Sequence, residues 1–367
     1  MKGLYIHIPF CVKKCEYCDF ISFTGCESRF SEYIDALTDE MTEYRDTEID
    51  TVFIGGGTPS LLTSELINRL CAAVKGNFRL AHDYEWTIEA NPGTVTDLKI
   101  QAMLCGGINR ISLGVQSFDN TELEAAGRIH NSETAYETVM KLYESGFHNI
   151  SIDLMESLPY QTEESFRRSL ETAVSLPIRH ISVYSLIIEE GTPIKKKYDE
   201  GIYKMPDEDN DRKLYHYTKQ FLAEYGFNRY EISNYAKPGY ESRHNLRYWN
   251  CGEYIGLGVA AASYTDGRRF NNTENLERYL SGSFRSSEFE ALTSEDMMGE
   301  FMMLGLRKTI GVSAADFEER FGKPIESIYG TQLGRFTRLG AMEYISGYYR
   351  LTERGLDVAN TVMCEFV

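Results

Sequence analysis

The chain has 367 residues, of which 42% are hydrophobic and 13% aromatic, and its formal net charge is −17. This length allows two domains, or one barrel with an appendage, and the apolar content can fill a large core. The acidic balance argues against a protein that binds nucleic acid through its phosphates, which requires clustered Lys and Arg, and it disfavours docking on anionic lipid.

The sequence contains no run of 18 apolar residues, so we expect no transmembrane helix and no integral membrane protein. The first apolar run is interrupted by His7 and Pro9 and is too short for a signal peptide. We therefore expect a cytoplasmic protein whose thiols are reduced.

Six runs in the first half of the chain are rich in Val, Ile and Tyr and are followed by Gly, Pro or Asn, which is typical of buried parallel strands. They lie at residues 4–8, 51–54, 84–89, 110–115, 149–155 and 180–186. Apolar residues repeat at helical spacing between them. Six strand–helix units predict an α/β fold, a partial (β/α)6 TIM-like barrel over residues 1–190. Right-handed crossovers would place the C-terminal end of every strand on one face.

A segment with Gly191, Pro193, Gly201 and Pro206 leads into an amphipathic helix at about 208–225. The residues from 227 to 290 are rich in tyrosine and turn residues, and we expect mostly loop there. We therefore divide the chain into the barrel, a linker helix with an aromatic loop region at 191–290, and a C-terminal domain at 291–367.

The C-terminal domain shows helical periodicity from a cap at Thr293 or Ser294, and again at 313–321 and 325–339. A hairpin at 342–351 turns at Ser346-Gly347, and a last helix runs to about residue 364. Helices with one hairpin predict a winged-helix-like unit. Eight Lys or Arg against eleven Asp or Glu give it a net charge of −3, so we expect packing or protein docking rather than nucleic-acid binding.

Three cysteines follow the first predicted strand in a C-x-x-x-C-x-x-C pattern, namely Cys11, Cys15 and Cys18. Such a loop can ligate three irons of a 4Fe–4S cubane and leave the fourth iron open to a small molecule. A structural zinc site normally uses paired cysteines, and no second pair exists here. A disulfide framework suits short secreted chains rather than this one. We interpret the other five cysteines as small buried residues or inert thiols.

Polar or glycine-rich motifs end the other strands. Gly55-Gly56-Gly57-Thr58-Pro59 follows the second strand and can bring backbone amides close to a ligand, but it lacks the Lys-Ser/Thr of a phosphate loop. Glu89 ends the third strand and is either a ligand-binding carboxylate or a solvated charge. Gln116 and Asp153 end the fourth and fifth strands, and Arg128 lies twelve residues after Gln116.

Residues 243–249 read Arg-His-Asn-Leu-Arg-Tyr-Trp. A neutral imidazole such as that of His244 can ligate haem iron, and Tyr248 and Trp249 offer flat surfaces for a macrocycle. A lone histidine is more often a hydrogen-bonding residue of a core or surface, so the segment alone leaves both interpretations open.

The segment Tyr5-Ile6-His7-Ile8-Pro9-Phe10-Cys11, together with Cys15, Tyr17 and Cys18, resembles the N-terminal signature of radical S-adenosylmethionine enzymes. More narrowly, nearly the whole chain resembles the branch that contains oxygen-independent coproporphyrinogen III oxidases and related haem chaperones. The resemblance implies a 4Fe–4S cluster on the three cysteines and haem contact by His244. It also implies S-adenosylmethionine at the barrel mouth, bound by Tyr5, Tyr17, Gly56, Gly57, Thr58, Glu89, Gln116, Arg128 and Asp153.

Two features of the oxidases are missing from this chain and distinguish them from the haem chaperones. The oxidases carry an N-terminal extension before the first strand and a further cysteine where this chain has Phe20. Both departures favour a haem chaperone that passes haem to respiratory proteins. An oxygen-independent coproporphyrinogen III dehydrogenase, which decarboxylates two propionates, is the alternative, and a radical enzyme acting on another tetrapyrrole is a third. The family's glycines around Leu158-Pro159 are replaced by Ser157 and Tyr160, which leaves the ligand placement at that rim open.

Overall fold

The computed structural model describes residues 1–205 and 208–367 of the chain. Its centre is a curved sheet of six parallel strands that follow one another in sequence order, as predicted. These strands are β1 (Lys2–Ile8), β2 (Glu48–Gly56), β3 (Arg79–Ala90), β4 (Arg110–Gln116), β5 (Ile150–Glu156) and β6 (His180–Ser185). The α/β partial-barrel class is thereby confirmed.

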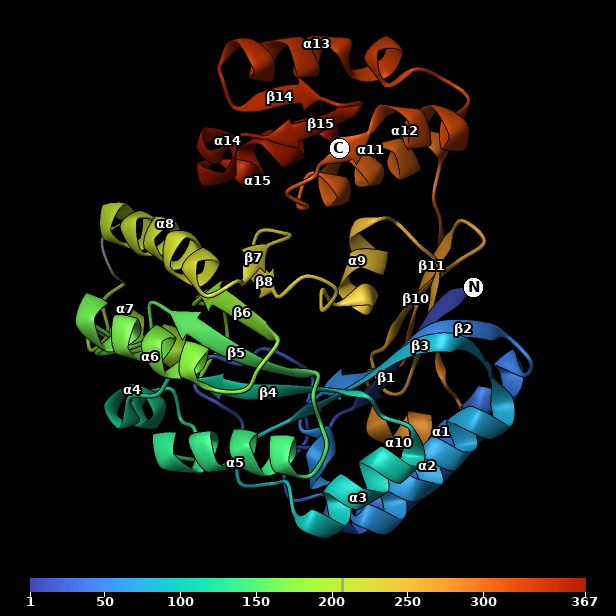
Figure 1. Cartoon of the computed structure of the whole chain (residues 1–367). Coiled ribbons are helices and arrows are strands. Elements are labelled where there is room, and N and C mark those ends of the chain that lie inside the picture. Colours follow the sequence, from blue (N-terminus) through green and yellow to red (C-terminus); the bar gives the residue numbers. More distant parts are fainter. Residues whose placement is uncertain (206–207) are drawn as a thin grey trace.

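Helices in the connections cover one face of this sheet (Figure 1). They are α1 (Phe30–Met41), α2 (Ser64–Asn77), α3 (Asp97–Gly106), α4 (Asn120–Ala125), α5 (Ser132–Glu144) and α6 (Glu163–Ser175). Side chains alternate along each strand because successive residues point to opposite faces. In β1, Leu4, Ile6 and Ile8 are fully buried in the main core, whereas Tyr5 and His7 line a cavity on the other face.

Further strands extend this sheet at both edges, which differs from the loop-rich region predicted after residue 227. Strand β9 (Tyr254–Leu257) runs parallel to β1 and continues antiparallel through β10 (Ala262–Thr265), β11 (Arg268–Asn272) and β12 (Arg285–Ala291). At the other edge, β8 (Asn234–Ala236) pairs with β6 and β7 (Asn228–Arg229). The prediction was wrong because these strands are short and pair with residues far away in sequence, which a local pattern does not record.

Four helices belong to the middle of the chain: α7 (Pro193–Asp199), α8 (Glu208–Glu224), α9 (Arg243–Trp249) and α10 (Leu276–Leu280). The predicted linker helix is confirmed as α8, while Pro206 of the predicted linker lies outside the described residues. Strands from before and after residue 190 belong to the same sheet. The predicted domain boundary at residue 190 therefore stays a prediction. Among the described residues, no helix has both the length and the apolar character required to span a bilayer.

The C-terminal unit, drawn in orange and red in Figure 1, has its own hydrophobic core. This core includes Met302, Phe317 and Leu333. Thr293 caps its first helix by accepting a hydrogen bond from the Asp296 amide, and the hairpin turns at Ser346-Gly347 as predicted. The predicted last helix is divided at Val358. The elements are α11 (Ser294–Gly305), β13 (Val312–Ser313), α12 (Ala314–Phe321), α13 (Ile325–Arg338), β14 (Met342–Ile345), β15 (Tyr348–Leu351), α14 (Glu353–Asp357) and α15 (Ala359–Met363).

Candidate functional site

A cavity of about 380 Å³ lies at the C-terminal ends of the parallel strands. Its lining contains every residue predicted for the cluster and S-adenosylmethionine except Tyr5. These are Cys11, Cys15, Cys18, Tyr17, Gly56, Gly57, Thr58, Glu89, Gln116, Arg128 and Asp153. The structure thus brings together residues that are spread over more than 140 positions of sequence.

The cysteine loop is closed at its base by backbone hydrogen bonds. The Cys11 amide donates to the Phe23 carbonyl at 3.0 Å, and the Phe23 amide donates to the Pro9 carbonyl at 2.6 Å. The middle of the loop is tied down because the Glu16 amide donates to the Ala126 carbonyl at 3.1 Å. All three thiols are half-buried and free of disulfide bonds.

The glycine motif follows the backbone of the cysteine loop closely. The Gly57 amide donates to the Ile8 carbonyl at 2.9 Å, and the Thr58 amide donates to the Phe10 carbonyl at 2.8 Å. A Cβ atom on Gly57 would lie 2.6 Å from the Phe10 carbonyl oxygen, and one on Gly56 would lie 2.5 Å from the His7 ring. Gly56 also has a φ of +110°, which favours glycine. A side chain at position 56 or 57 would therefore clash with neighbouring atoms.

Two carboxyl groups, Glu89 and Asp153, share the cavity. Burial raises the pKa of Glu89 to about 8, with a further contribution from Asp153, and burial also raises the pKa of Asp153. Glu89 accepts a hydrogen bond from the Gly56 amide at 3.0 Å, and Asp153 accepts from the Ser112 hydroxyl at 3.4 Å. A cationic ligand group would favour the ionised form of either carboxyl group.

Arg128 connects the cysteine loop with the strand ends. One guanidinium nitrogen donates to Cys15 Sγ at 3.3 Å, and the other donates to the Asn91 side chain at 2.7 Å and the Gly114 carbonyl at 2.6 Å. Asn91 in turn donates to the Thr58 hydroxyl at 3.0 Å. Arg128 therefore ties Cys15 of the cysteine loop to the end of β4.

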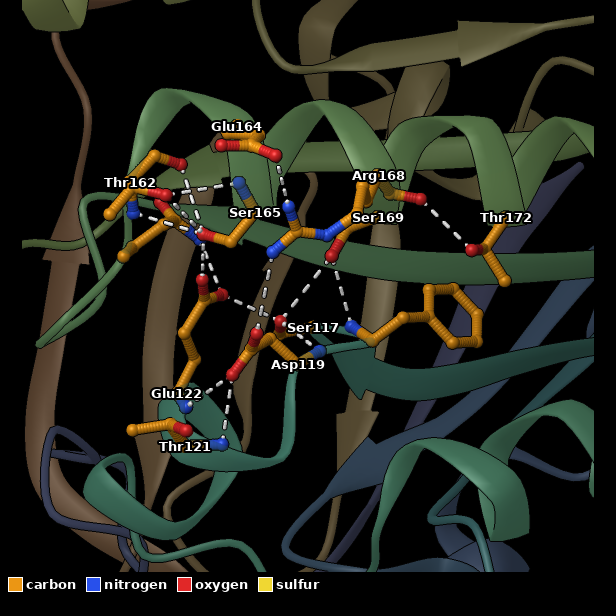
Figure 2. A network of polar contacts seen from close by, with 12 residues as sticks. Ser117, Asp119, Thr121, Glu122, Thr162, Glu164, Ser165, Arg168, Ser169 and Thr172 are labelled. Carbon is orange, nitrogen blue, oxygen red and sulfur yellow. Dashed lines mark hydrogen bonds and ion pairs between the residues drawn. The ribbon is translucent and has the colours of Figure 1, made fainter.

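The segment between Gln116 and Arg128 is held in place by the polar network of Figure 2. Glu122 on α4 is 1% exposed and accepts a hydrogen bond from the Ser117 hydroxyl at 2.6 Å and another from the Ser165 hydroxyl. Ser169, next on the same face of α6, accepts from the Phe118 amide at 3.1 Å. Helix α6 therefore fixes the loop that follows β4. At its start, Gln116 has a φ of +69°, a costly conformation for a residue other than glycine.

The rim after β5 contains Ser157 and Tyr160, the two residues that stand where the resemblance implies glycines, and their backbone conformation is informative. Ser157 and Tyr160 have φ values of +63° and +64°, in the left-handed region that glycine adopts most easily. Ser157 is held there because its hydroxyl donates to Asp211 at 2.7 Å and its carbonyl accepts from Tyr203. The backbone path typical of glycine is thus retained without glycine.

The three half-buried thiols of the cysteine loop are a donor set that an iron–sulfur cluster can use. Within residues 1–205 and 208–367, no three His, Cys, Asp or Glu side chains form a group suited to one ion. A cubane instead distributes its thiolates over separate irons. Cys15 and Cys11 already receive hydrogen bonds from Arg128 and from the Thr58 hydroxyl, at 3.3 and 3.7 Å, which suit anionic sulfur.

Tyr5 and His244 lie outside the lining of this cavity. Tyr5 donates to His7 Nδ1 at 2.9 Å and lines a neighbouring cavity. His244 on α9 is 1% exposed, and both of its ring nitrogens are occupied: Nδ1 lies 3.0 Å from the Thr51 hydroxyl and Nε2 lies 2.8 Å from the Tyr248 hydroxyl. In this structure the imidazole therefore has no free nitrogen for iron.

Sequence reasoning missed several residues of the cavity, including Asn91, Ser112, Met155 and Tyr184. Asn91 carried a signal, since it follows Glu89 at the same strand end. Tyr184 did not, because it reaches the site through its pairing with Met155 on β5, a register between strands that the sequence does not show.

Comparisons with known proteins agree with this geometry. The radical SAM superfamily profile matches residues 5–173, and the HemN C-terminal domain profile matches residues 292–358. The heme chaperone HemW of Lactococcus lactis is 36% identical over 99% of this chain and 96% of its own length. HemW of Bacillus subtilis is 35% identical over 100% of this chain and 99% of its own.

Among solved structures, coproporphyrinogen III oxidase (HemN) from Escherichia coli, a radical SAM enzyme, superposes with a TM-score of 0.85. The match covers 99% of this chain and 89% of the oxidase at 22% identity, so it bears on the fold. The sequence relatives show to which of the two related families this chain is more similar. The chain belongs to the HemW family of the radical SAM superfamily.

Proposed function

We propose that this protein is a cytoplasmic haem chaperone. It would hold a 4Fe–4S cluster through Cys11, Cys15 and Cys18, bind S-adenosylmethionine beside it, and bind haem at a site that includes His244. It would then deliver the haem to haem-requiring respiratory proteins. The observation that carries this proposal is the single cavity that gathers the cysteines with the glycine motif and the buried carboxyl groups. Full-length similarity to heme chaperones supports the cargo.

The cluster, when bound, supplies an open iron and an electron. The protein's part is to position and shield the ligand. The ionised form of Glu89 would accept hydrogen bonds from an ammonium group of S-adenosylmethionine, and the glycine motif would let the ligand approach the backbone closely. Gln116 and Asp153 on the neighbouring strands β4 and β5 would offer further polar contacts. Arg128 would bind a carboxylate. Tyr17 lines the same space, whereas Tyr5 lines the neighbouring cavity.

A second candidate function is oxygen-independent coproporphyrinogen III dehydrogenase. The fold similarity to the E. coli oxidase over 99% of this chain favours it. The sequence relatives favour the chaperone, and Phe20 stands where the oxidases carry a further cysteine.

The two functions are separated by anaerobic reconstitution with iron and sulfide. We expect the reconstituted protein to gain cluster absorbance, to bind haemin in a titration, and to leave coproporphyrinogen III unchanged in the presence of reductant and S-adenosylmethionine. Formation of harderoporphyrinogen or protoporphyrinogen would establish the dehydrogenase instead. A protein without cluster absorbance after reconstitution would contradict both functions.

A further inference from the structure

A further cleft, of about 800 Å³, opens beside the cavity of the cysteine loop. Its lining comes from Val12 of that loop, from the segments after β2 and β3, from the first turn of α3, and from the segment that leads from β4 into α5. Among the described residues, Arg128 alone lines both this cleft and the first cavity. The volume is within the range of about 300–1,000 Å³ that is usual for small-molecule sites. The chain thus has room for a ligand outside the site that the proposed function uses.

Lys99 supplies a cation to this cleft, and in the described part of the chain its ammonium group donates only to uncharged acceptors. These are the Ser60 carbonyl at 2.6 Å and the Thr94 carbonyl at 3.0 Å. An ammonium group has three hydrogens, so one is left for a ligand. Burial lowers the pKa of Lys99, as expected for an ammonium group without a counter-ion. A bound anion would supply that counter-ion.

The start of helix α3 borders the same cleft. Thr96 precedes the helix and lines the cleft, but its side chain makes no capping hydrogen bond. The first intrahelical bond runs from the Ile100 amide to the Thr96 carbonyl at 2.9 Å, so helix geometry leaves the amides from Asp97 to Lys99 without a carbonyl partner. The Asp97 carboxylate, which could compensate the helix dipole, instead pairs with Lys141 at 2.8 Å. Free amides beside a lysine are a combination that binds phosphate.

An unpartnered nitrogen of His130 is an independent sign of a ligand. His130 is 7% exposed and lines the cleft. Its Nε2 atom lies 3.1 Å from the Val115 carbonyl, which can only accept, so Nε2 carries the hydrogen. Burial, followed by the charge of Arg128, lowers the pKa of His130 to about 4, so the ring is neutral and Nδ1 is an acceptor. Among the described residues nothing donates to Nδ1, and a buried acceptor without a donor is costly.

Two further side chains of the lining narrow the kind of ligand. The Nε atom of Arg128 is buried without a hydrogen-bond partner in the described part of the chain, although both other guanidinium nitrogens are bonded. A hydroxyl group both accepts and donates, so it matches Arg128 Nε and His130 Nδ1 in type. Glu124 adds an exposed carboxylate, which repels an anionic group and so favours its placement at Lys99. The cleft therefore suits a molecule with an anionic end and a hydroxyl group.

We propose that this cleft binds a small phosphate ester with a free hydroxyl group, such as a sugar phosphate. Lys99 and the first amides of α3 bind the phosphate group, and His130 Nδ1 accepts a hydrogen bond from the hydroxyl group. The three terminal oxygens of a phosphate monoester match these several donors better than the two oxygens of a carboxylate. The inference goes beyond the proposed function, since it requires neither the cluster nor haem. Lipid headgroups carry the same phosphate chemistry, so the test separates free esters from a membrane.

The test is isothermal titration of the full chain, as purified, with ribose 5-phosphate. We expect saturable binding, and binding at least about tenfold weaker for methyl phosphate, which keeps the phosphate group but has no sugar hydroxyl groups. Lys99→Gln should bind ribose 5-phosphate at least about tenfold more weakly than the wild type. Lys75→Gln is the matched control, because it makes the same change of charge at an exposed position of α2, and it should bind like the wild type.

Thr96→Asp keeps the test decisive if Lys99→Gln disturbs the carbonyls that this lysine holds. Aspartate is a favoured N-cap residue, so its carboxylate should occupy the free amides of α3. The variant should be at least as stable as the wild type in urea and yet bind ribose 5-phosphate at least about tenfold more weakly. His130→Gln can still donate to the Val115 carbonyl but lacks the Nδ1 acceptor. It should lose the preference for ribose 5-phosphate over methyl phosphate.

Several outcomes would overturn the proposal. Equal affinity of the wild type, Lys99→Gln and Thr96→Asp for ribose 5-phosphate would place the ester elsewhere on the chain. Methyl phosphate bound as tightly as ribose 5-phosphate would remove the hydroxyl group and His130 from it. Sedimentation with phosphatidylcholine vesicles that contain phosphatidic acid is the membrane arm. Vesicle binding that depends on Lys99, without binding of the free ester, would support the phosphate site and assign it to a lipid headgroup, whereas no binding of any probe would refute the site.

Discussion

Gly57 has no room for a side chain. A Cβ atom added to Gly57 would lie 2.6 Å from the carbonyl oxygen and 2.8 Å from the backbone nitrogen of Phe10. The cysteine loop and the glycine motif can therefore lie this close only if residue 57 has no side chain. Gly76, in the last turn of α2, has open space around its Cα and is exposed. The same substitution should therefore act in opposite directions at these two positions.

We expect Gly57→Ala to destabilise the protein by about 1–3 kcal/mol, because backbone must shift to admit the methyl group. It should also impair cluster reconstitution. Gly76→Ala should stabilise by about 0.5–1 kcal/mol, because alanine loses less entropy in a helix. Urea unfolding and the iron content after reconstitution measure both effects. Equal stability of the two variants would refute the steric argument.

At the scale of elements, the mouth of the barrel is shaped by loops that helices hold in place. The network around Glu122 joins the loop after β4 to α6 (Figure 2), and Arg128 follows shortly after the end of α4. Gln161 adds a third hydrogen bond to Glu122 at 2.9 Å. The position of Arg128 in the cavity thus depends on an acid that does not line it.

Glu122→Ala should lower the free energy of unfolding by about 3 kcal/mol, because it leaves buried hydroxyl and amide donors without an acceptor. Glu124→Ala, on the same helix but exposed, should change it by no more than about 0.5 kcal/mol. Urea unfolding of both variants gives the comparison. A Glu122→Ala protein as stable as Glu124→Ala would show that water replaces the lost acceptor.

At the scale of the whole molecule, several carboxyl groups are buried by the tertiary structure. Burial is the largest cause that raises the pKa of Glu40 and Glu156 to about 7, and that of Glu89 to about 8. A carboxyl group whose pKa is higher in the folded than in the unfolded chain favours folding when it is protonated. Its contribution is complete below the unfolded value of about 4.5 and is lost as the pH rises through the folded value.

The contribution of these carboxyl groups to the free energy of unfolding, measured without S-adenosylmethionine, should therefore fall as the pH rises from about 5 to about 8. Buried histidines such as His130 and His244, whose pKa is lowered by burial, contribute in the opposite direction up to about pH 6.5 and are common to the variants compared below. In Glu156→Gln, whose side chain stays neutral, this fall should shrink by up to about 3 kcal/mol. Glu171→Gln, at an exposed position of α6, should follow the wild-type curve. Parallel curves for Glu156→Gln and the wild type would mean that Glu156 stays accessible to water.

The sequence by itself determined the order of the six strands and the polar residues at their ends. Strand–helix alternation is local, and right-handed crossovers bring all strand ends to one face, so local patterns are enough to assign the cysteines, Glu89 and Asp153 to one site.

Only the tertiary structure decided how the middle of the chain completes the barrel. Strand β9 pairs with β1, about 250 residues away, and α9 is a seven-residue helix, too short for a periodic pattern. For the same reason the sequence could not show that Tyr248 lines a cavity whose lining does not include His244. Which atom of a motif faces a ligand depends on packing between remote segments, and such contacts leave no mark on the spacing of residues.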